Sequence, residues 1–266
     1  MLKLNLYEGM IDMASVTQLA RTYKQPYGGY LPVRTFTKKQ FDDGIELSTN
    51  ENILPQLVGL AVDYLTRLCQ NQSFETAFSI SLRGIDNYKA ITNQSVDPSM
   101  MEINGLDDKS IINACRLASF DVWYRNLAAA RTFKDPKLIQ PNAETINNIK
   151  TMVTRTLTFF DNYEPIVENG FTMPGGYTAT VDSGDGDYLT THTLVDLKVS
   201  KQNINSKYTL QLAMYYLMGM HSINPNFENI ETLAIFNPRL NKLYSRTITD
   251  IDHDVLTSIT SDVIAY

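Results

Sequence analysis

The chain has 266 residues, a formal net charge of -6 and 43% hydrophobic residues, which is typical of an ordinary globular protein. Its acidity argues against a protein that coats nucleic acid by bulk charge, although it allows a local basic groove. Two cysteines without a Cys-x-x-Cys pair cannot build a zinc ribbon or a thiolate cluster, and they fit a reducing cytoplasm.

No run of about 18 apolar residues occurs in the sequence, so we expect no membrane span. The first 13 residues, MLKLNLYEGMIDM, lack the apolar core of a signal peptide. The sequence therefore predicts a cytoplasmic protein without a membrane partner.

The first 160 or so residues are predicted to be mainly helical. Apolar residues recur at helical spacing, and capping residues precede several of these runs. Ser15 opens the first predicted helix, and Asp107 and Asp108 favour the first turn of the third. The predicted helices cover residues 14–23, 51–70, 105–125 and 142–163.

The pattern changes near Gly170, where strand signals begin. Residues 175–181 alternate like a strand, the sequence SGDG reads as a turn, and residues 187–200 give two further strand segments. The later elements are a helix over 208–222, a strand hairpin over 230–248 that turns at 237–241, and a closing helix over 252–266.

The order of these elements is helices followed by strand–strand–strand–helix–strand. This order predicts an α/β fold with a mixed central sheet flanked by helices. We expect a single domain over residues 1–266, with a helical N-terminal half up to about residue 165 and a core of sheet and helix over about 170–250.

Asp196 and Lys198 interrupt the apolar run from Thr193 to Val199. A strand buried on both faces is normally apolar throughout, and burying these charges costs several kcal/mol unless they are paired or bind an ion. Alternation places both side chains on one face, and a hairpin would bring Asp187 close to Asp196. Two carboxylates and one ammonium suit Mg²⁺ or Mn²⁺ and the hydrolysis of a phosphate ester.

Two simpler interpretations of this stretch stay open. The pattern Asp-x-Lys occurs twice elsewhere in the chain, so the segment could be an exposed hairpin with a structural ion pair. An EF-hand loop starting at Asp182 fails because Gly184, Gly186 and Thr193 stand where oxygen ligands are required. An irregular calcium turn is the second alternative.

The segment resembles the RecB-like branch of the PD-(D/E)XK nuclease superfamily. The sequence as a whole is most similar to the small stand-alone exonucleases of this branch. Three motifs match in chain order, and they are Gly184-x-x-Asp187, Asp196-x-Lys198 and Gln211-x-x-x-Tyr215. The resemblance extends over most of the sequence but is specific only over residues 175–220.

The resemblance implies a restriction-endonuclease-like core and a role for each motif residue. Asp187, Asp196 and the carbonyl of Leu197 would bind Mg²⁺ or Mn²⁺, and Lys198 would be the catalytic lysine. Gln211 and Tyr215 would complete the catalytic set on the following helix. The chain lacks the four cysteines that hold an iron–sulfur cluster in some relatives, so that cofactor is not expected.

Three other carboxylates are candidates for the metal site. Asp182 and Asp185 compete with Asp187 for the place of the first ligand, and the Gly-x-x-Asp spacing favours Asp187. The stretch VGLAVDYLTRL resembles the Gly-x-x-x-His helix of the branch, with Asp63 in place of the histidine. Asp63 is either a further ligand or a solvated helical residue. The stretch ASVTQLARTY resembles the Ser-x-Ser-x-Leu helix opening of the same nucleases.

The resemblance implies a metal-dependent deoxyribonuclease, with exonuclease action on DNA ends or single strands. The alternatives are a nucleic-acid-binding or scaffold protein that keeps the fold without turnover, a hydrolase of another phosphoester, and a calcium-stabilised structural protein. The chain has no helicase motif, so a helicase or other protein partner would be a separate chain. The cations expected to contact phosphate are Lys201, Lys207, Arg239, Lys242 and Arg246.

Overall fold

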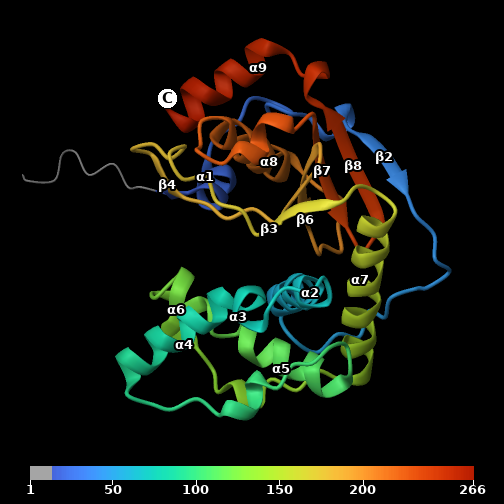
Figure 1. The fold of residues 1–266 in the computed structure, drawn as a ribbon, viewed down its shortest axis with the longest axis vertical. Coiled ribbons are helices and arrows are strands. Elements are labelled where there is room, and N and C mark those ends of the chain that lie inside the picture. The colour runs from blue at the N-terminus through green and yellow to red at the C-terminus, as the bar shows by residue number, and fades with distance from the viewer. Residues whose placement is uncertain (1–13) are drawn as a thin grey trace, which may run out of the picture.

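The structure is a computed structural model that describes residues 14–266. The prediction that residues 1–13 lack the core of a signal peptide falls outside the described residues. Figure 1 shows two lobes that face each other. The sheet lobe holds the β-sheet with helices α1 (Val16–Thr22), α8 (Ser206–Met220) and α9 (His253–Ser258). The helical lobe holds α2 (Pro55–Cys69), α3 (Phe74–Ala77), α4 (Ser79–Thr92), α5 (Asp108–Ala118) and α6 (Asp121–Arg125). Helix α7 (Ala143–Asp161) runs from one lobe to the other.

The main sheet is mixed and has six strands within the described residues. Strands β6 and β7 pair in parallel, and every other neighbouring pair is antiparallel. In spatial order the strands are β2 (Thr37–Gln40), β8 (Lys242–Thr247), β7 (Thr232–Asn237), β6 (Thr193–Leu197), β5 (Tyr188–Thr190) and β3 (Ile166–Asn169). This confirms the predicted α/β class with helices on both sides of a mixed sheet.

Helix α8 makes the crossover that the parallel pair β6–β7 requires. Alternation along β6 sends Leu194 toward α8 and Val195 toward the helical lobe, and both side chains are fully buried. The sheet therefore lies between two apolar layers, and β6 is buried along its whole length.

Local capping explains where several helices begin. The side chains of Ser15, Asp107 and Asn142 accept hydrogen bonds from backbone N–H groups in the first turns of α1, α5 and α7. Pro55 starts α2, where a missing N–H costs nothing. These starts agree with the predicted helices to within a few residues.

Several sequence predictions are confirmed and others are wrong. The helices predicted over 14–23, 51–70, 142–163 and 208–222 are present, as is the hairpin at 237–241. The single helix predicted over 105–125 is instead α5 and α6, separated by Ser119 and Phe120. The helical stretch 74–92 was not predicted. The strands β2 and β3 were also not predicted, because β2 is exposed at all four positions and β3 is short.

The strand predicted over 175–181 does not form. Gly175 has a φ of +87°, and a Cβ on Gly176 would lie 2.0 Å from the carbonyl oxygen of Met218. The two glycines therefore make a turn tightly packed against α8. A strand begins only at Val181, where β4 (Val181–Ser183) pairs in parallel with β1 (Ala14–Ser15).

The helical part of the chain begins later than predicted. Residues 14–40 supply α1, β1 and β2, and all three pack with the sheet lobe. The helical lobe is thus an insertion between β2 and β3 in chain order.

None of the helices within residues 14–266 has the length and apolar composition needed to cross a membrane.

Candidate functional site

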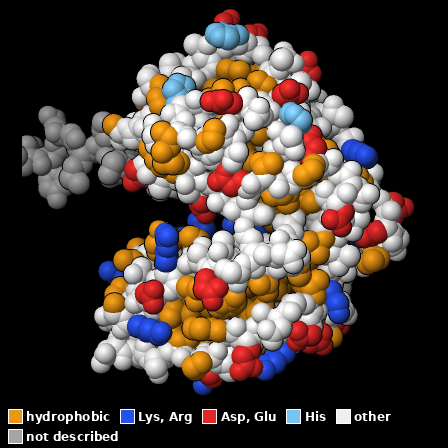
Figure 2. All heavy atoms as spheres, in the orientation of Figure 1, with side chains coloured by type: hydrophobic (Ala, Val, Ile, Leu, Met, Phe, Trp, Pro, Cys, Tyr) orange, Lys and Arg blue, Asp and Glu red, His pale blue; other side chains and the backbone are white. Residues whose placement is uncertain are grey.

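A hollow of about 670 Å³ lies between the two lobes, and it is visible in Figure 2 as the indentation between the upper and lower halves. Helices α2 and α6 line it from the helical lobe, and β6, α8 and the loop before β5 line it from the sheet lobe. We call this feature the central hollow. Its charged lining includes Asp63, Arg67, Arg125, Asp185, Asp187, Asp196 and Lys198.

Strand register brings Asp187 and Asp196 together on the floor of the central hollow. Tyr188 pairs with Val195 in the antiparallel hairpin of β5 and β6, so the preceding residue Asp187 lies opposite Asp196. The backbone N–H of Leu197 donates a 2.7 Å hydrogen bond to Asp187 Oδ2. The predicted hairpin is therefore present. Leu197 contacts Asp187 through its backbone N–H, whereas the prediction for Leu197 concerned its carbonyl.

Asp196 keeps one buried oxygen without a hydrogen bond. Its side chain is 3% exposed, and Lys198 Nζ lies 2.8 Å from Oδ1 and 2.7 Å from Oδ2. Only the contact to Oδ1 has hydrogen-bond geometry, and Oδ2 accepts no hydrogen bond from any described residue. Oδ2 is therefore held by charge attraction to Lys198 and keeps a free lone pair that a further positive group could use.

The pKa values of this group follow from burial and crowding. Burial raises the pKa of Asp187 to about 8, and the charges of Asp196 and Asp63 add to the effect. Burial also raises the pKa of Asp196, although Lys198 opposes it. Burial by itself would lower the pKa of Lys198, but Asp196 and Asp187 outweigh it and the pKa is raised. The positive charge near Asp187 and Asp196 therefore does not fully compensate the negative charge of their carboxylates.

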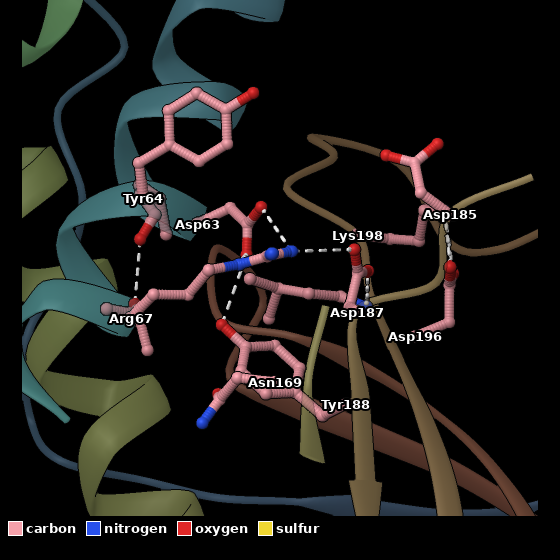
Figure 3. Close-up of polar contacts among 12 residues, drawn as sticks. Asp63, Tyr64, Arg67, Asn169, Asp185, Asp187, Tyr188, Asp196 and Lys198 are labelled. Carbon is pink, nitrogen blue, oxygen red and sulfur yellow. Dashed lines mark hydrogen bonds and ion pairs between the residues drawn. The ribbon is translucent and has the colours of Figure 1, made fainter. Parts of the chain in front are cut away.

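Asp63 and Arg67 reach the same cluster from α2, as Figure 3 shows. We call the group of Asp63, Arg67, Asp187, Asp196 and Lys198 the floor of the central hollow. Arg67 Nε and Nη2 lie 3.0 and 2.9 Å from the two oxygens of Asp63, and the hydroxyl of Tyr188 donates to Asp63 Oδ1 at 3.1 Å. Arg67 Nη2 also lies 3.7 Å from Asp187 Oδ1. Asp63 is 16% exposed, so it is a partly buried member of the cluster whose two oxygens are both engaged.

Gln211 and Tyr215 lie one turn apart on α8 and support the loop that leads into β5. Gln211 Nε2 donates to the hydroxyl of Tyr215 at 2.9 Å and to Thr17 Oγ1 at 2.8 Å. The Tyr215 hydroxyl donates to the backbone carbonyl of Asp185 at 2.8 Å. This pair therefore fixes the backbone two residues before Asp187 and links α8 to α1.

The two competing carboxylates lie in different surroundings from Asp187. Asp185 forms a two-pronged ion pair with Arg125, with distances of 3.1 and 2.7 Å, and this pair joins the sheet lobe to α6 of the helical lobe. Asp182 is exposed on β4, where it accepts a hydrogen bond from Ser183 Oγ. Of the candidates for the first ligand, Asp187 is the one placed opposite Asp196 by the strand register.

The sequence analysis missed Arg67, Arg125 and Tyr188. The spacing of four residues between Asp63 and Arg67 on a helix was a usable signal, because such residues are neighbours on one helix face. Of the cations expected to contact phosphate, Lys201 and Arg239 line the central hollow. The remaining three lie outside it, and they are Lys207 on α8 and Lys242 and Arg246 on β8.

The residues of the floor fit one divalent cation of the Mg²⁺ type. Among residues 14–266, no three His, Cys, Asp or Glu side chains come together in the manner of a complete metal site. Asp187 and Asp196 nevertheless supply hard oxygen ligands, and Oδ2 of Asp196 contacts Lys198 by charge without accepting a hydrogen bond from it. Mg²⁺ commonly binds to one or two carboxylates and completes its coordination with water.

Comparison of the chain with protein-family models, with curated proteins and with solved structures finds no match. The structure establishes an α/β protein with a mixed sheet flanked by helices, and its function is inferred from the chemistry of the central hollow.

Proposed function

We propose that the chain is a metal-dependent nuclease of the RecB-like PD-(D/E)XK type, with a restriction-endonuclease-like core, that hydrolyses phosphodiester bonds in DNA. The observation that carries this proposal is the cluster of the buried Asp196 with the partly buried Asp187 and Lys198 in the lining of the hollow, where one ammonium faces two adjacent carboxylates. Perturbed carboxylates in a hollow between lobes are typical of catalytic sites.

Each residue of the cluster has a role in this proposal. Asp187 and Asp196 would hold Mg²⁺ or Mn²⁺, with the carbonyl of Leu197 as a further ligand, and the bound ion supplies a Lewis acid and an acidified water. Lys198 is a partly buried ammonium beside Asp196, suited to orient the attacking water or to balance charge that develops on the phosphate. Gln211 and Tyr215 would keep the Asp187 loop in register.

The shape of the central hollow favours a DNA end as the substrate. The ion pair between Arg125 and Asp185 joins the two lobes beside the cluster. A free strand end can enter a space bridged in this way, whereas a closed duplex would first have to break the bridge. Tyr208 also lines the hollow and is partly exposed, and aromatic rings stack on unpaired bases. These features support exonuclease action.

The test uses purified protein with end-labelled linear DNA and closed circular DNA of the same sequence. Each substrate is incubated with Mg²⁺, with Mn²⁺ or with a chelator, and a matched RNA is included. We expect cleavage of the linear DNA that requires metal and is absent in Asp196→Asn. Cleavage of both DNAs would contradict the exonuclease part of the proposal, and metal-independent cleavage would contradict all of it.

A catalytically inactive nucleic-acid-binding protein that retains the nuclease fold is the second candidate. It is favoured by the observation that Arg67 engages both oxygens of Asp63, which leaves fewer free ligands than an active metal centre with three carboxylates. This candidate predicts DNA binding that is unchanged by the chelator, together with no cleavage in either metal.

A further inference from the structure

Arg67 is an arginine embedded in a cluster of carboxylates. Its side chain is 14% exposed and contacts Asp63 through two nitrogens, while Nη2 lies 3.7 Å from Asp187. The guanidinium carbon also lies 5.8 Å from the centre of the Tyr188 ring. The guanidinium is therefore held on three sides, which is unusual for a residue that serves only as surface charge.

Backbone geometry keeps room for this guanidinium. Gly170 follows β3 with a φ of +72°, and a Cβ at this position would lie 2.3 Å from Arg67 Nη1. The N–H of Gly170 donates a 2.7 Å hydrogen bond to the backbone carbonyl of Asp187. The same short segment thus adjoins both Arg67 and Asp187 and fixes their relative position.

The charges of the floor leave a small deficit of positive charge. Asp63, Asp187 and Asp196 carry three negative charges when ionised, and Arg67 and Lys198 carry two positive charges, so the sum is -1. One divalent ion would turn this sum to +1, which suits a site that receives an anionic phosphate. A second divalent ion would turn it to +3 and would have to displace Arg67 from Asp63 and Asp187.

We infer that Arg67 is a built-in cation that takes the place of a second metal ion, so that the centre binds one divalent ion on Asp187 and Asp196. This inference rests on the proposed function, because it assumes that the floor binds metal. Arg67 is a positioning residue in this scheme. It holds Asp63 away from the ion and lowers the affinity of the floor for divalent cations.

The test measures metal binding without any substrate. Isothermal titration with Mn²⁺ gives the number of ions and the affinity, and electron paramagnetic resonance reports whether two Mn²⁺ ions lie close enough to couple. We expect one ion in the wild-type protein. Arg67→Gln should bind the first ion at least about tenfold more tightly, since a neighbouring positive charge is removed, and it should accept a second, spin-coupled ion.

Three further variants keep the test decisive. Arg67→Lys retains the charge and should bind one ion at an affinity close to that of the wild type. Arg21→Gln removes an exposed charge from the lining of the same hollow and is the matched control, which should change affinity by less than about twofold. If Arg67→Gln fails to fold, Gly170→Ala displaces the guanidinium with Arg67 still present and should also tighten binding.

The outcomes separate this inference from the proposed function. Two ions in the wild-type protein, or an Arg67→Gln variant that binds one ion at wild-type affinity or more weakly, would overturn the role of Arg67 while the metal centre itself stands. Absence of any Mn²⁺ binding to the wild-type floor at millimolar concentration would overturn the metal-dependent function, and the inference with it.

Discussion

Two charge clusters adjoin the central hollow, and they differ in how well their charges are matched. One is the floor of the central hollow. The other is a clamp made of Asp43, Glu51, Arg155 and Arg239. In the clamp, Arg239 Nη1 lies 2.7 Å from Glu51, and Arg155 contacts Asp43 at 2.7 and 2.8 Å. Arg155 also donates to the carbonyls of Ile45, Pro238 and Arg239, so that α7 is joined to the turn between β7 and β8.

The pKa shifts of the two clusters have opposite directions. In the clamp, burial would raise the pKa of Glu51, but the hydrogen bonds from Arg239 and Asn148 outweigh it and the pKa is lowered. Hydrogen bonds from Arg155 lower the pKa of Asp43. On the floor, the pKa values of Asp187 and Asp196 are raised. Breaking a cluster with matched charges is costly to stability, whereas a cluster with unmatched carboxylates is suited to bind a cation.

The largest expected effect comes from removing a charge from the floor. Asp196→Asn and Lys198→Ala should each lower the rate of DNA hydrolysis by about 10²–10³-fold, the range for loss of a group that stabilises the transition state directly. Asp196→Asn should not lower the free energy of unfolding, because it removes a buried carboxylate whose charge is incompletely matched, whereas Lys198→Ala should lower it, because it leaves Asp196 without its ion-pair partner. Single-turnover cleavage and thermal unfolding check the two parts, and retained cleavage by Asp196→Asn would contradict the assignment.

The equivalent change in the clamp should affect stability instead. Glu51→Ala leaves the buried guanidinium of Arg239 without its partner, and we expect a loss of about 3–5 kcal/mol in the free energy of unfolding. Urea unfolding measures it. A loss below about 1 kcal/mol would mean that the clamp is not the structural counterpart of the floor.

The Asp63→Asn variant tests whether Asp63 aids metal binding by holding Arg67 away from the ion. Loss of the carboxylate releases Arg67, which can then turn fully toward Asp187 and compete with the ion. We expect the Mg²⁺ concentration needed for half-maximal activity to rise by roughly 10–100-fold. The effect on metal affinity is opposite in sign to that of Arg67→Gln, and an equal tightening in both variants would contradict this account.

The clamp should also confer sensitivity to acid. The folded-state pKa of Glu51 is lowered, so its contribution to stability is fully present above its ordinary pKa of about 4.3 and is lost as the pH falls through the lowered value. The Glu51→Gln variant should therefore lose less stability than the wild type as the pH falls from about 5 to about 2. Urea midpoints measured across this range give the difference, and parallel curves would contradict it.

The smallest expected effect belongs to the competing carboxylate on β4. Asp182 is exposed and accepts its hydrogen bond from the neighbouring Ser183. Asp182→Asn should leave Mn²⁺ affinity unchanged and alter the free energy of unfolding by less than about 0.5 kcal/mol. A clear loss of metal affinity in this variant would move the first ligand from Asp187 to Asp182.

Much of the fold was predictable from local patterns. Helical periodicity located α1, α5 and α7, helped by Ser15 and Asp107 at the starts of the first two, and alternation located β5 and β6. Predictions failed where a distant contact decides the conformation. The glycines at 175 and 176 turn because they pack against α8, and β2 is a strand only because it pairs with β8.

The sequence by itself determined the carboxylates and the lysine of the candidate site, because Asp187, Asp196 and Lys198 lie on one hairpin whose register follows from two-residue alternation. Only the tertiary structure decided their surroundings. Arg67 reaches Asp187 from α2, more than a hundred residues earlier in the chain, through the packing of the helical lobe on the sheet. Charge matching between distant elements depends on that packing, and no local pattern in the chain encodes it.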